Sequence, residues 1–488
     1  MKLAGVIVTW VALLLGTAVA ADLPRSSPEE QGLSSGVISE FVAAADKFDS
    51  MNSLMIVRHG HVIVEGWWTP YDRESRHSLY SLSKSFTSTA VGIAIAEGKL
   101  KLDDEVLKAF PDAAPAEVSG QLKSMRLSDL LRMNTGHQTE PPRTGDSWIK
   151  TFLAHPVPFK PGTHFLYNTS ATYMQSAMVQ KATGQTVLDY LKPRLFEPLG
   201  IENPTWEMSP EGIATGGYGL SVRTEDIAKF GQLYLQRGKW NGKQLVQSEW
   251  VDAATARQTS NGSNPASDWD QGYGYQFWRC RNGAYRGDGA FGQYCIVMPE
   301  QDTVIAITSG LRDMQAVLNL IWDKLLPAMQ SAPVTANKEA QAELKKQLTK
   351  LTVRMPVSID KPSKSFGKKY VFKANDLKID SVVLRAGDDD KTTVLDLKID
   401  GADEKIVCGN GRWEKGKLAF GPLTAQPAAA AGAWTAEDTF TAKLCFYETP
   451  FLVTVQLKVN GDELELSSQA NVGFGPQKAV KIAGTAAP

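Results

Sequence analysis

The sequence predicts an α/β fold of the α+β kind, in which one sheet is flanked by helices and carries an inserted helical subdomain, followed by a C-terminal all-β barrel or sandwich domain. Three observations support this. The 488 residues exceed one ordinary core. Strand-like segments lie near both ends of the first 330 residues, with helical segments between them. The C-terminal part has strand composition broken by Gly, Asp and Asn turns.

The N-terminus has the pattern of a signal peptide over residues 1–20. Lys2 precedes an apolar run from Leu3 that ends in Ala18-Val19-Ala20, the small-residue spacing that a signal peptidase accepts. We expect cleavage after Ala20 and export to a periplasmic or secreted location. An uncleaved membrane anchor is the alternative, because the run is almost long enough to span a bilayer.

Residues 21–330 contain the elements of the first domain. A helix is expected near 35–47, capped by Ser34 or Ser35, and two strands flank the turn at 59–61. Residues 100–240 are mostly helical and loop-rich and include a helix at 224–236. Strands are then expected at 274–278, 294–298 and 303–307, with a closing helix near 313–329. The active site is expected where the sheet meets the helical subdomain.

The C-terminal part begins with a helical linker at residues 331–351, which are rich in Ala, Lys, Glu and Gln. Residues 352–488 predict the all-β domain, with strands near 369–372, 381–384, 394–397, 451–455 and 464–466. The run from Ala428 to Ala431 is expected to be a short loop. Three roles stay open for this domain: capping the active-site mouth, self-association, or binding a cell-envelope component.

The charge balance argues against nucleic acid as a partner. Lys and Arg number 52 against 53 Asp and Glu, which gives a net charge of -1, and no basic stripe is present that could neutralise phosphates. We therefore expect a pocket for a small molecule. No metal site is expected, because His59-Gly60-His61 is better explained as a hairpin turn than as a ligand pair.

The four cysteines are Cys280, Cys295, Cys408 and Cys445, two in each predicted domain. Export would place them in an oxidising compartment, so disulfides joining Cys280 to Cys295 and Cys408 to Cys445 are expected. Zinc prefers closely spaced ligand pairs, which these residues do not form.

The strongest functional signal is Ser81-Leu82-Ser83-Lys84 at the start of a long apolar run that predicts a buried helix. A serine and a lysine three residues apart lie on one helical face. The helix N-terminus favours a developing oxyanion and discourages the lysine from keeping its proton. We therefore predict Ser81 as the nucleophile and Lys84 as its proton acceptor.

The same Ser-x-x-Lys spacing recurs at three other places, Ser147 to Lys150, Ser358 to Lys361 and Ser365 to Lys368. The first lies in a loop-like segment rich in Pro and Gly, and the others precede strands. None is expected to begin a buried helix, so only the copy at Ser81 predicts catalysis.

Several ordered blocks extend this signal over about three hundred residues. They are residues 79–104, Leu130 to Gly136, Pro161 to Asn168, Gly216 to Leu220 and Gly289 to Gln293. Together they resemble the serine hydrolases that share the class C β-lactamase and D,D-peptidase fold, with esterases and 6-aminohexanoate-dimer hydrolases closest. The resemblance implies an antiparallel sheet flanked by helices.

The resemblance also implies roles for further residues. Tyr167 corresponds to the tyrosine of the second motif, which shares the serine proton with the lysine, and a nearby cation is expected to lower the pKa of its phenol. The usual Tyr-x-Asn here reads Tyr167-Asn168-Thr169, which leaves the substrate-binding role of Asn168 open.

The third motif departs further from the family pattern. Its usual Lys-Thr-Gly or His-x-Gly aligns with Gly287, Asp288 and Gly289, which are expected to contact substrate but include no cation. Arg286 is the neighbouring residue that could compensate. The backbone N–H of Ala290 is expected to be the second oxyanion donor beside that of Ser81.

These features predict an exported serine hydrolase that cleaves an ester or amide through an acyl-enzyme, without a cofactor. One alternative is D,D-peptidase, penicillin-binding or β-lactamase activity, which the missing cation weakens. A second alternative is a catalytically inactive relic that binds a ligand.

Overall fold

The protein is described by a computed structural model that covers residues 22–359, 366–389, 391–475 and 477–487. The predicted signal peptide, residues 1–20, lies outside these described residues. Among the helices of the described ranges, none has both the length and the apolar composition needed to cross a bilayer.

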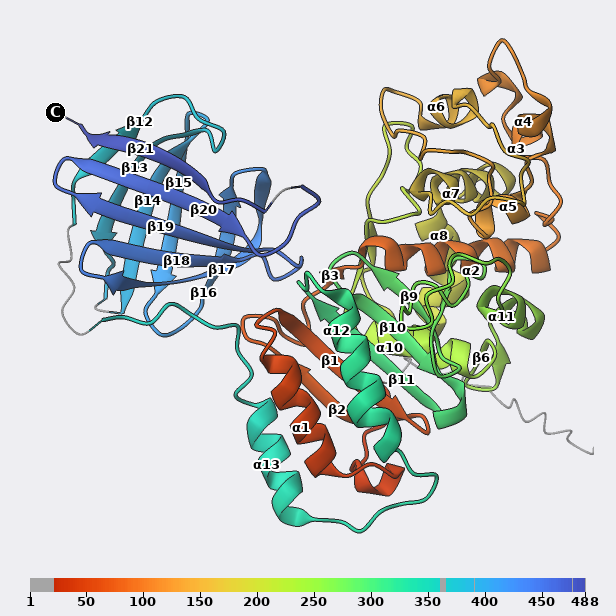
Figure 1. The fold of residues 1–488 in the computed structure, drawn as a ribbon, viewed down its shortest axis with the longest axis horizontal. Helices are drawn as coiled ribbons and strands as arrows, with labels where there is room; N and C mark the ends of the chain where they lie inside the picture. The colour runs from red at the N-terminus through yellow and green to blue at the C-terminus, as the bar shows by residue number, and fades with distance from the viewer. Residues whose placement is uncertain (1–21, 360–365, 390, 476, 488) are drawn as a thin grey trace, which may run out of the picture.

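The centre of the N-terminal unit is a six-stranded antiparallel sheet (Figure 1). Its strands in spatial order are β2 (His61–Trp67), β1 (Met51–Arg58), β11 (Thr303–Ser309), β10 (Gln293–Met298), β9 (Tyr285–Gly289) and β8 (Trp278–Arg279). The early strand β1 pairs directly with the late strand β11, with Ile56 opposite Ile305. The predicted assembly of one sheet from distant parts of the chain is therefore confirmed.

Helices cover both faces of this sheet. On one face, α10 (Thr224–Leu235) packs on β11 and β10, and α2 (Ser83–Ala96) follows the short turn η2 (Tyr80–Leu82). The elements on the other face are α1 (Ser35–Asp46), α12 (Met314–Leu320), η6 (Ile321–Leu325) and α13 (Lys338–Leu348), the last within the predicted linker (Figure 1). Ser34 caps α1 by accepting from the Val37 N–H, as predicted.

The inserted subdomain consists of short helices packed around α7 (Thr169–Thr183). They are α3 (Val106–Ala109), η3 (Pro111–Ala113), α4 (Gly120–Ser124), α5 (Leu127–Leu131), α6 (Trp148–Ala154), α8 (Val187–Leu191), η4 (Lys192–Phe196) and α9 (Glu197–Leu199). The remaining short elements are η1 (Glu29–Gln31), β3 (His77–Ser78), β4 (Thr205–Trp206), β5 (Leu220–Val222), β6 (Lys239–Trp240), β7 (Lys243–Gln244), α11 (Ser248–Thr255), η5 (Pro299–Gln301) and η7 (Leu326–Ala328). Contacts between α2 and α7 join the subdomain to the sheet unit.

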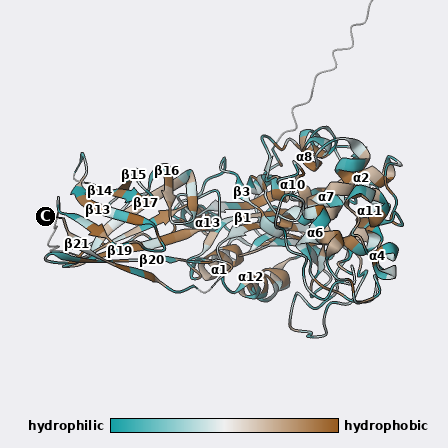
Figure 2. Cartoon of the chain, turned by 90° about the horizontal axis from the view of Figure 1, so that it is seen from above, coloured by the Kyte–Doolittle hydropathy of each residue, from teal (hydrophilic) through white to brown (hydrophobic). Residues whose placement is uncertain are grey.

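The C-terminal domain is a closed barrel with its own apolar core, and its strands pair antiparallel except where β15 meets β17. Its strands are β12 (Lys369–Phe372), β13 (Ile379–Ala386), β14 (Thr392–Ile399), β15 (Ala402–Gly409), β16 (Glu414–Phe420), β17 (Leu423–Ala436), β18 (Thr439–Cys445), β19 (Leu452–Asn460), β20 (Glu463–Ala470) and β21 (Val480–Ala486). Nine of the ten strands form the closed barrel, because β15 pairs with β17 through Gly409 and Ala431. The tenth strand, β16, pairs with β17 outside the barrel. Figure 2 shows hydrophilic and hydrophobic residues interspersed along these strands.

Two local predictions of secondary structure are wrong. Of the expected strand at 274–278, only Trp278 is in β8, and Gln276 has a φ of 66°, because the carbonyls of Tyr275 and Gln276 turn to accept hydrogen bonds from α2. The expected loop from Ala428 to Ala431 is the buried middle of β17, where small side chains fit inside the barrel.

The disulfide prediction is also overturned, because all four cysteines are free thiols. Cys280 and Cys295 lie in the cores on opposite faces of the sheet. Cys408 lies inside the barrel, whereas Cys445 packs in the core that the barrel shares with the N-terminal unit. Each predicted pair is therefore separated by a layer of structure rather than brought within bonding distance.

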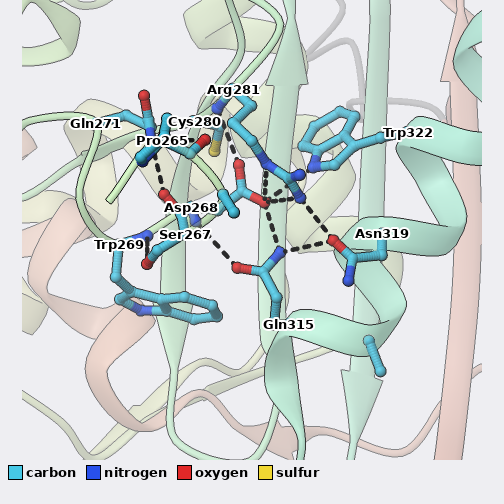
Figure 3. A network of polar contacts seen from close by, with 12 residues as sticks. Pro265, Ser267, Asp268, Trp269, Gln271, Cys280, Arg281, Gln315, Asn319 and Trp322 are labelled. Atoms are coloured by element: carbon cyan, nitrogen blue, oxygen red, sulfur yellow. Dashed lines mark hydrogen bonds and ion pairs between the residues drawn. The ribbon is translucent and has the colours of Figure 1, made fainter. Parts of the chain in front are cut away.

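A buried carboxylate ties the segment before β8 to the helices α12 and η6. Asp268, which is 0% exposed, accepts hydrogen bonds from Arg281, Gln315 and Trp322 at 2.8, 2.6 and 2.9 Å (Figure 3). Burial alone would raise the pKa of Asp268, but these donors outweigh it and lower the pKa. The network holds the sheet edge that carries β8 and β9.

Replacing this carboxylate should destabilise the protein. Asp268→Asn keeps the shape but leaves Arg281 without its charged partner, so the free energy of unfolding should fall by about 3 kcal/mol in urea titrations. Asp252→Asn, which breaks the exposed Arg237 pair, is the control and should change stability little. Equal stability of the two variants would contradict a structural role for Asp268.

Candidate active site

The site is built around α2, a helix that is buried almost all round. Its hydroxyl side chains are satisfied by two loops. Ser85 and Ser88 donate to the carbonyls of Gln276 and Tyr275, and Thr87 donates to the carbonyl of Gly216, each at 2.8 Å. These bonds let a polar helix occupy the core and hold both loops against its first turn.

Ser81 and Lys84 meet at that first turn, as predicted from their spacing. Ser81 lies in η2 and is half-buried, and the Lys84 Nζ is 2.9 Å from its Oγ. The amine also donates to the Gly217 carbonyl at 2.8 Å and to Thr169 Oγ1 at 3.3 Å. Three oxygen atoms therefore fix the amine beside the hydroxyl.

Lys84 is only 1% exposed, and the contacts just described give its amine no carboxylate partner. Burial lowers the pKa of Lys84 to about 7, because the charged form loses water that neutral acceptors replace only in part. Near neutral pH a large fraction of the amine is thus unprotonated and able to accept the Ser81 proton.

Tyr167 lies beside the same pair, and its interaction with Ser81 would on its own lower the pKa of the phenol. Its ring lies under the Lys84 amine, with Nζ 4.9 Å from the ring centroid, and stacks on Trp278 at 5.2 Å. Burial and the negative charge of Asp288 raise the pKa of Tyr167. The expectation of a lowered pKa is therefore wrong, and the phenol of Tyr167 stays neutral near pH 7.

Two residues of the second motif, Asn168 and Thr169, have different contacts. Asn168 is fully buried and caps α7 by accepting from the Ala171 N–H at 3.0 Å, so its side chain does not reach the cleft. Thr169, at the third position of the motif, contacts the Lys84 amine instead. The shifted asparagine is thus a helix cap, and a threonine occupies the position beside the lysine.

The third motif lies on β9, which passes directly against the nucleophile turn. A Cβ at Gly287 would lie 2.5 Å from Leu82 Cδ1, and one at Gly289 would lie 2.0 Å from the Leu79 carbonyl oxygen. Both positions therefore lack room for a side chain. This close approach brings Ala290, the next residue, to the same cleft as Ser81.

Arg286 cannot serve as the compensating substrate cation. It is 0% exposed and donates through Nε to Asp288 at 2.9 Å and through a terminal nitrogen to the Asp268 carbonyl at 2.7 Å. Burial raises the pKa of Asp288, although Arg286 opposes the shift. Trp278, the ring on which Tyr167 stacks, also lowers the pKa of Asp288, so the Arg286–Asp288 pair lies behind this stacked ring.

The cleft beside Ser81 has a volume of about 420 Å³. Its lining residues are Ser78, Tyr80, Ser81, Arg143, Thr169, Glu207, Tyr218, Gly219, Ala290 and Phe474. Ser81 and Ala290, the two expected oxyanion donors, both line it. Their neighbours Tyr80 and Phe291 have φ values of 47° and 68°, a strained backbone of the kind found at functional sites.

The structure thus brings together Ser81, Lys84, Tyr167 and Ala290. Sequence reasoning missed Thr169 and the Gly217 carbonyl, although the shifted second motif was a signal for the first. The Ser147 copy of the motif caps the short helix α6, with Lys150 exposed. Within the described ranges, no cluster of three or more His, Cys, Asp or Glu residues could hold a metal.

The chain is similar in sequence to several curated proteins. Among curated relatives, 6-aminohexanoate-dimer hydrolase of Paenarthrobacter ureafaciens is 26% identical over 288 residues, which cover 54% of this chain and 73% of the relative. D-aminopeptidase of Brucella anthropi is 26% identical over 163 residues, 30% of this chain and 31% of the relative.

Solved structures share the fold. A penicillin-binding protein homologue from Caulobacter crescentus superposes with a TM-score of 0.50 at 16% identity, over 63% of this chain and all of that chain. A candidate 6-aminohexanoate-dimer hydrolase from Bacillus anthracis reaches a TM-score of 0.51 at 20% identity, over 62% of this chain and 87% of that chain.

The family profile described as Beta-lactamase matches residues 41–320, more than half of the chain, from the middle of α1 to the end of α12. The chain therefore belongs to the Beta-lactamase family of hydrolases.

Proposed function

We propose that the protein is a serine hydrolase that cleaves an ester or amide bond through an acyl-enzyme on Ser81. The observation that carries this proposal is the buried Lys84 amine, 2.9 Å from the Ser81 hydroxyl with a pKa lowered to about 7. A base of that pKa can take a hydroxyl proton at neutral pH.

In acylation, Ser81 Oγ attacks the substrate carbonyl while its proton passes to the neutral Lys84. The carbonyl oxygen becomes an oxyanion, which the backbone N–H groups of Ser81 and Ala290 stabilise from the wall of the cleft. The tetrahedral intermediate then collapses to the acyl-enzyme as the leaving group departs.

Tyr167 protonates that leaving group. Its phenol is neutral and lies against the Lys84 amine, so it can give its proton to the leaving group while the Lys84 ammonium replaces it with the proton that came from Ser81. In deacylation, water gives a proton to Lys84 and attacks the ester, and Ser81 Oγ is released as the hydroxyl.

The site favours a neutral ester or amide over a carboxylate-bearing lactam or peptide. The third motif has no side chain at Gly287 or Gly289, and Arg286 is held by Asp288 away from the cleft. Arg143, the cation that does line the cleft, is paired with Glu140. The names of the relatives, a 6-aminohexanoate-dimer hydrolase and a D-aminopeptidase among them, agree with cleavage of this bond class. We also propose that the protein acts after export, on the strength of its leader-like residues 1–20.

Removal of the nucleophile should abolish catalysis. Ser81→Ala should lower kcat for p-nitrophenyl acetate by at least about a thousandfold and prevent labelling by a fluorophosphonate, because it removes the hydroxyl that is paired with the buried Lys84 amine. Ser147→Ala, in the second Ser-x-x-Lys copy, is the matched control and should keep full labelling. Turnover of nitrocefin faster than esters by the wild type would favour β-lactamase activity instead.

The pH profile should report Lys84. Since only the neutral amine accepts the Ser81 proton, kcat/KM for a neutral ester should rise about tenfold per pH unit below pH 7 and level off above it. No fall is expected up to pH 9, because Tyr167 stays neutral. A rise centred near pH 10 would contradict the assignment of Lys84 as the base.

Loss of the phenol should slow turnover without unfolding the site. Tyr167→Phe keeps the ring on Trp278 but removes the relay, so kcat should fall about a hundredfold while the melting temperature stays within a few degrees. Tyr273→Phe, a neighbouring ring 6.2 Å away, is the control and should retain activity within a few-fold. Equal activities of the two variants would exclude Tyr167 from proton transfer.

A further inference from the structure

One residue of the barrel lies in the cleft of the N-terminal unit. Phe474, on the connection between β20 and β21, lines the cleft together with Ser81 and Ala290. It is 79% exposed, the second most exposed of the large apolar side chains of the described residues after Val357 at 80%. Glycines on both sides, Gly473 and Gly475, let the ring project from the chain.

The ring of Phe474 contacts two rings that adjoin the oxyanion donors. Its centroid lies 5.8 Å from that of Tyr80, the residue before Ser81, and 5.0 Å from that of Phe291, the residue after Ala290. We call Tyr80, Phe291 and Phe474 the aromatic rim. Because Tyr80 and Phe291 hold strained φ values, the backbone itself places their rings beside the reacting centre.

The base of the loop is anchored to the N-terminal unit. Arg312 Nε donates to the Asn471 carbonyl at 2.7 Å, and the Asn471 side chain donates to the Gly310 carbonyl at 3.4 Å. Val472 is buried, and Phe451 of the next barrel loop lies 6.2 Å from Phe291. These contacts hold the barrel against the cleft, and Phe474 adds little to them because most of its surface is exposed.

We propose that Phe474 is a specificity-determining residue, which binds an apolar substituent of the substrate against the aromatic rim. This inference rests on the proposed function. An exposed phenyl ring gains free energy when an apolar group covers it, and rings at this spacing offer a flat apolar surface. Its place at the mouth of the cleft makes the substrate itself the group that covers it.

The test uses the full-length protein and two series of esters. Phe474→Ala should lower kcat/KM about tenfold, mainly through KM, for one of two substrates: p-nitrophenyl hexanoate, if the rim binds the acyl group, or 2-naphthyl acetate, if it binds the leaving group. Ethyl acetate, which is small on both sides, should change less than about twofold. Val357→Ala, equally exposed but remote from the cleft, is the control.

Binding without turnover separates this inference from the catalytic proposal. In the Ser81→Ala background, adding Phe474→Ala should raise the Kd about tenfold by calorimetry for whichever of the two esters shows the KM effect, and adding Phe474→Tyr should leave that Kd nearly unchanged. If the wild type turns over no ester but the Kd values change as expected, only the catalytic proposal is contradicted. Equal Kd values and equal ester profiles for Phe474→Ala and Val357→Ala would overturn the inference.

Discussion

The interaction on which the site depends is the burial of one amine among neutral oxygen atoms. Lys84 contacts Ser81, Thr169 and the Gly217 carbonyl, and none of these carries a charge that would stabilise an ammonium. Its low pKa is a consequence of packing, because the hydroxyls of α2 are satisfied by the loops that close around it. The same packing lets β9 pass close enough to bring Ala290 to the cleft.

The parts of the site that are local in sequence could be predicted from it. Ser81 and Lys84 share a helical face, so their spacing alone placed them together. Tyr167 comes from a distant segment and needed the resemblance to a family. Thr169 and the Gly217 carbonyl were missed because a backbone oxygen has no sequence signature, and Phe474 was missed because its position depends on how the barrel packs against the N-terminal unit.

The fold was predictable where the apolar pattern matched the element, as in β1, β11 and α10. The prediction failed where tertiary contacts, rather than local composition, determined the structure. The alanines 428–431 suggested a loop but are the buried middle of β17, with Ala428 and Ala430 inside the barrel. Cys280 and Cys295 are close in sequence, yet the sheet separates them, since which face a strand residue occupies depends on register.

The central claim is that Lys84 is largely neutral at the pH at which the enzyme works. An NMR titration of the ¹⁵N-labelled side-chain amine, assigned with Lys84→Arg, measures this protonation directly and does not require a substrate. The account predicts a pKa of about 7 for this amine. A pKa near the ordinary lysine value of about 10.4 would contradict it, because the base would then be protonated throughout the working range.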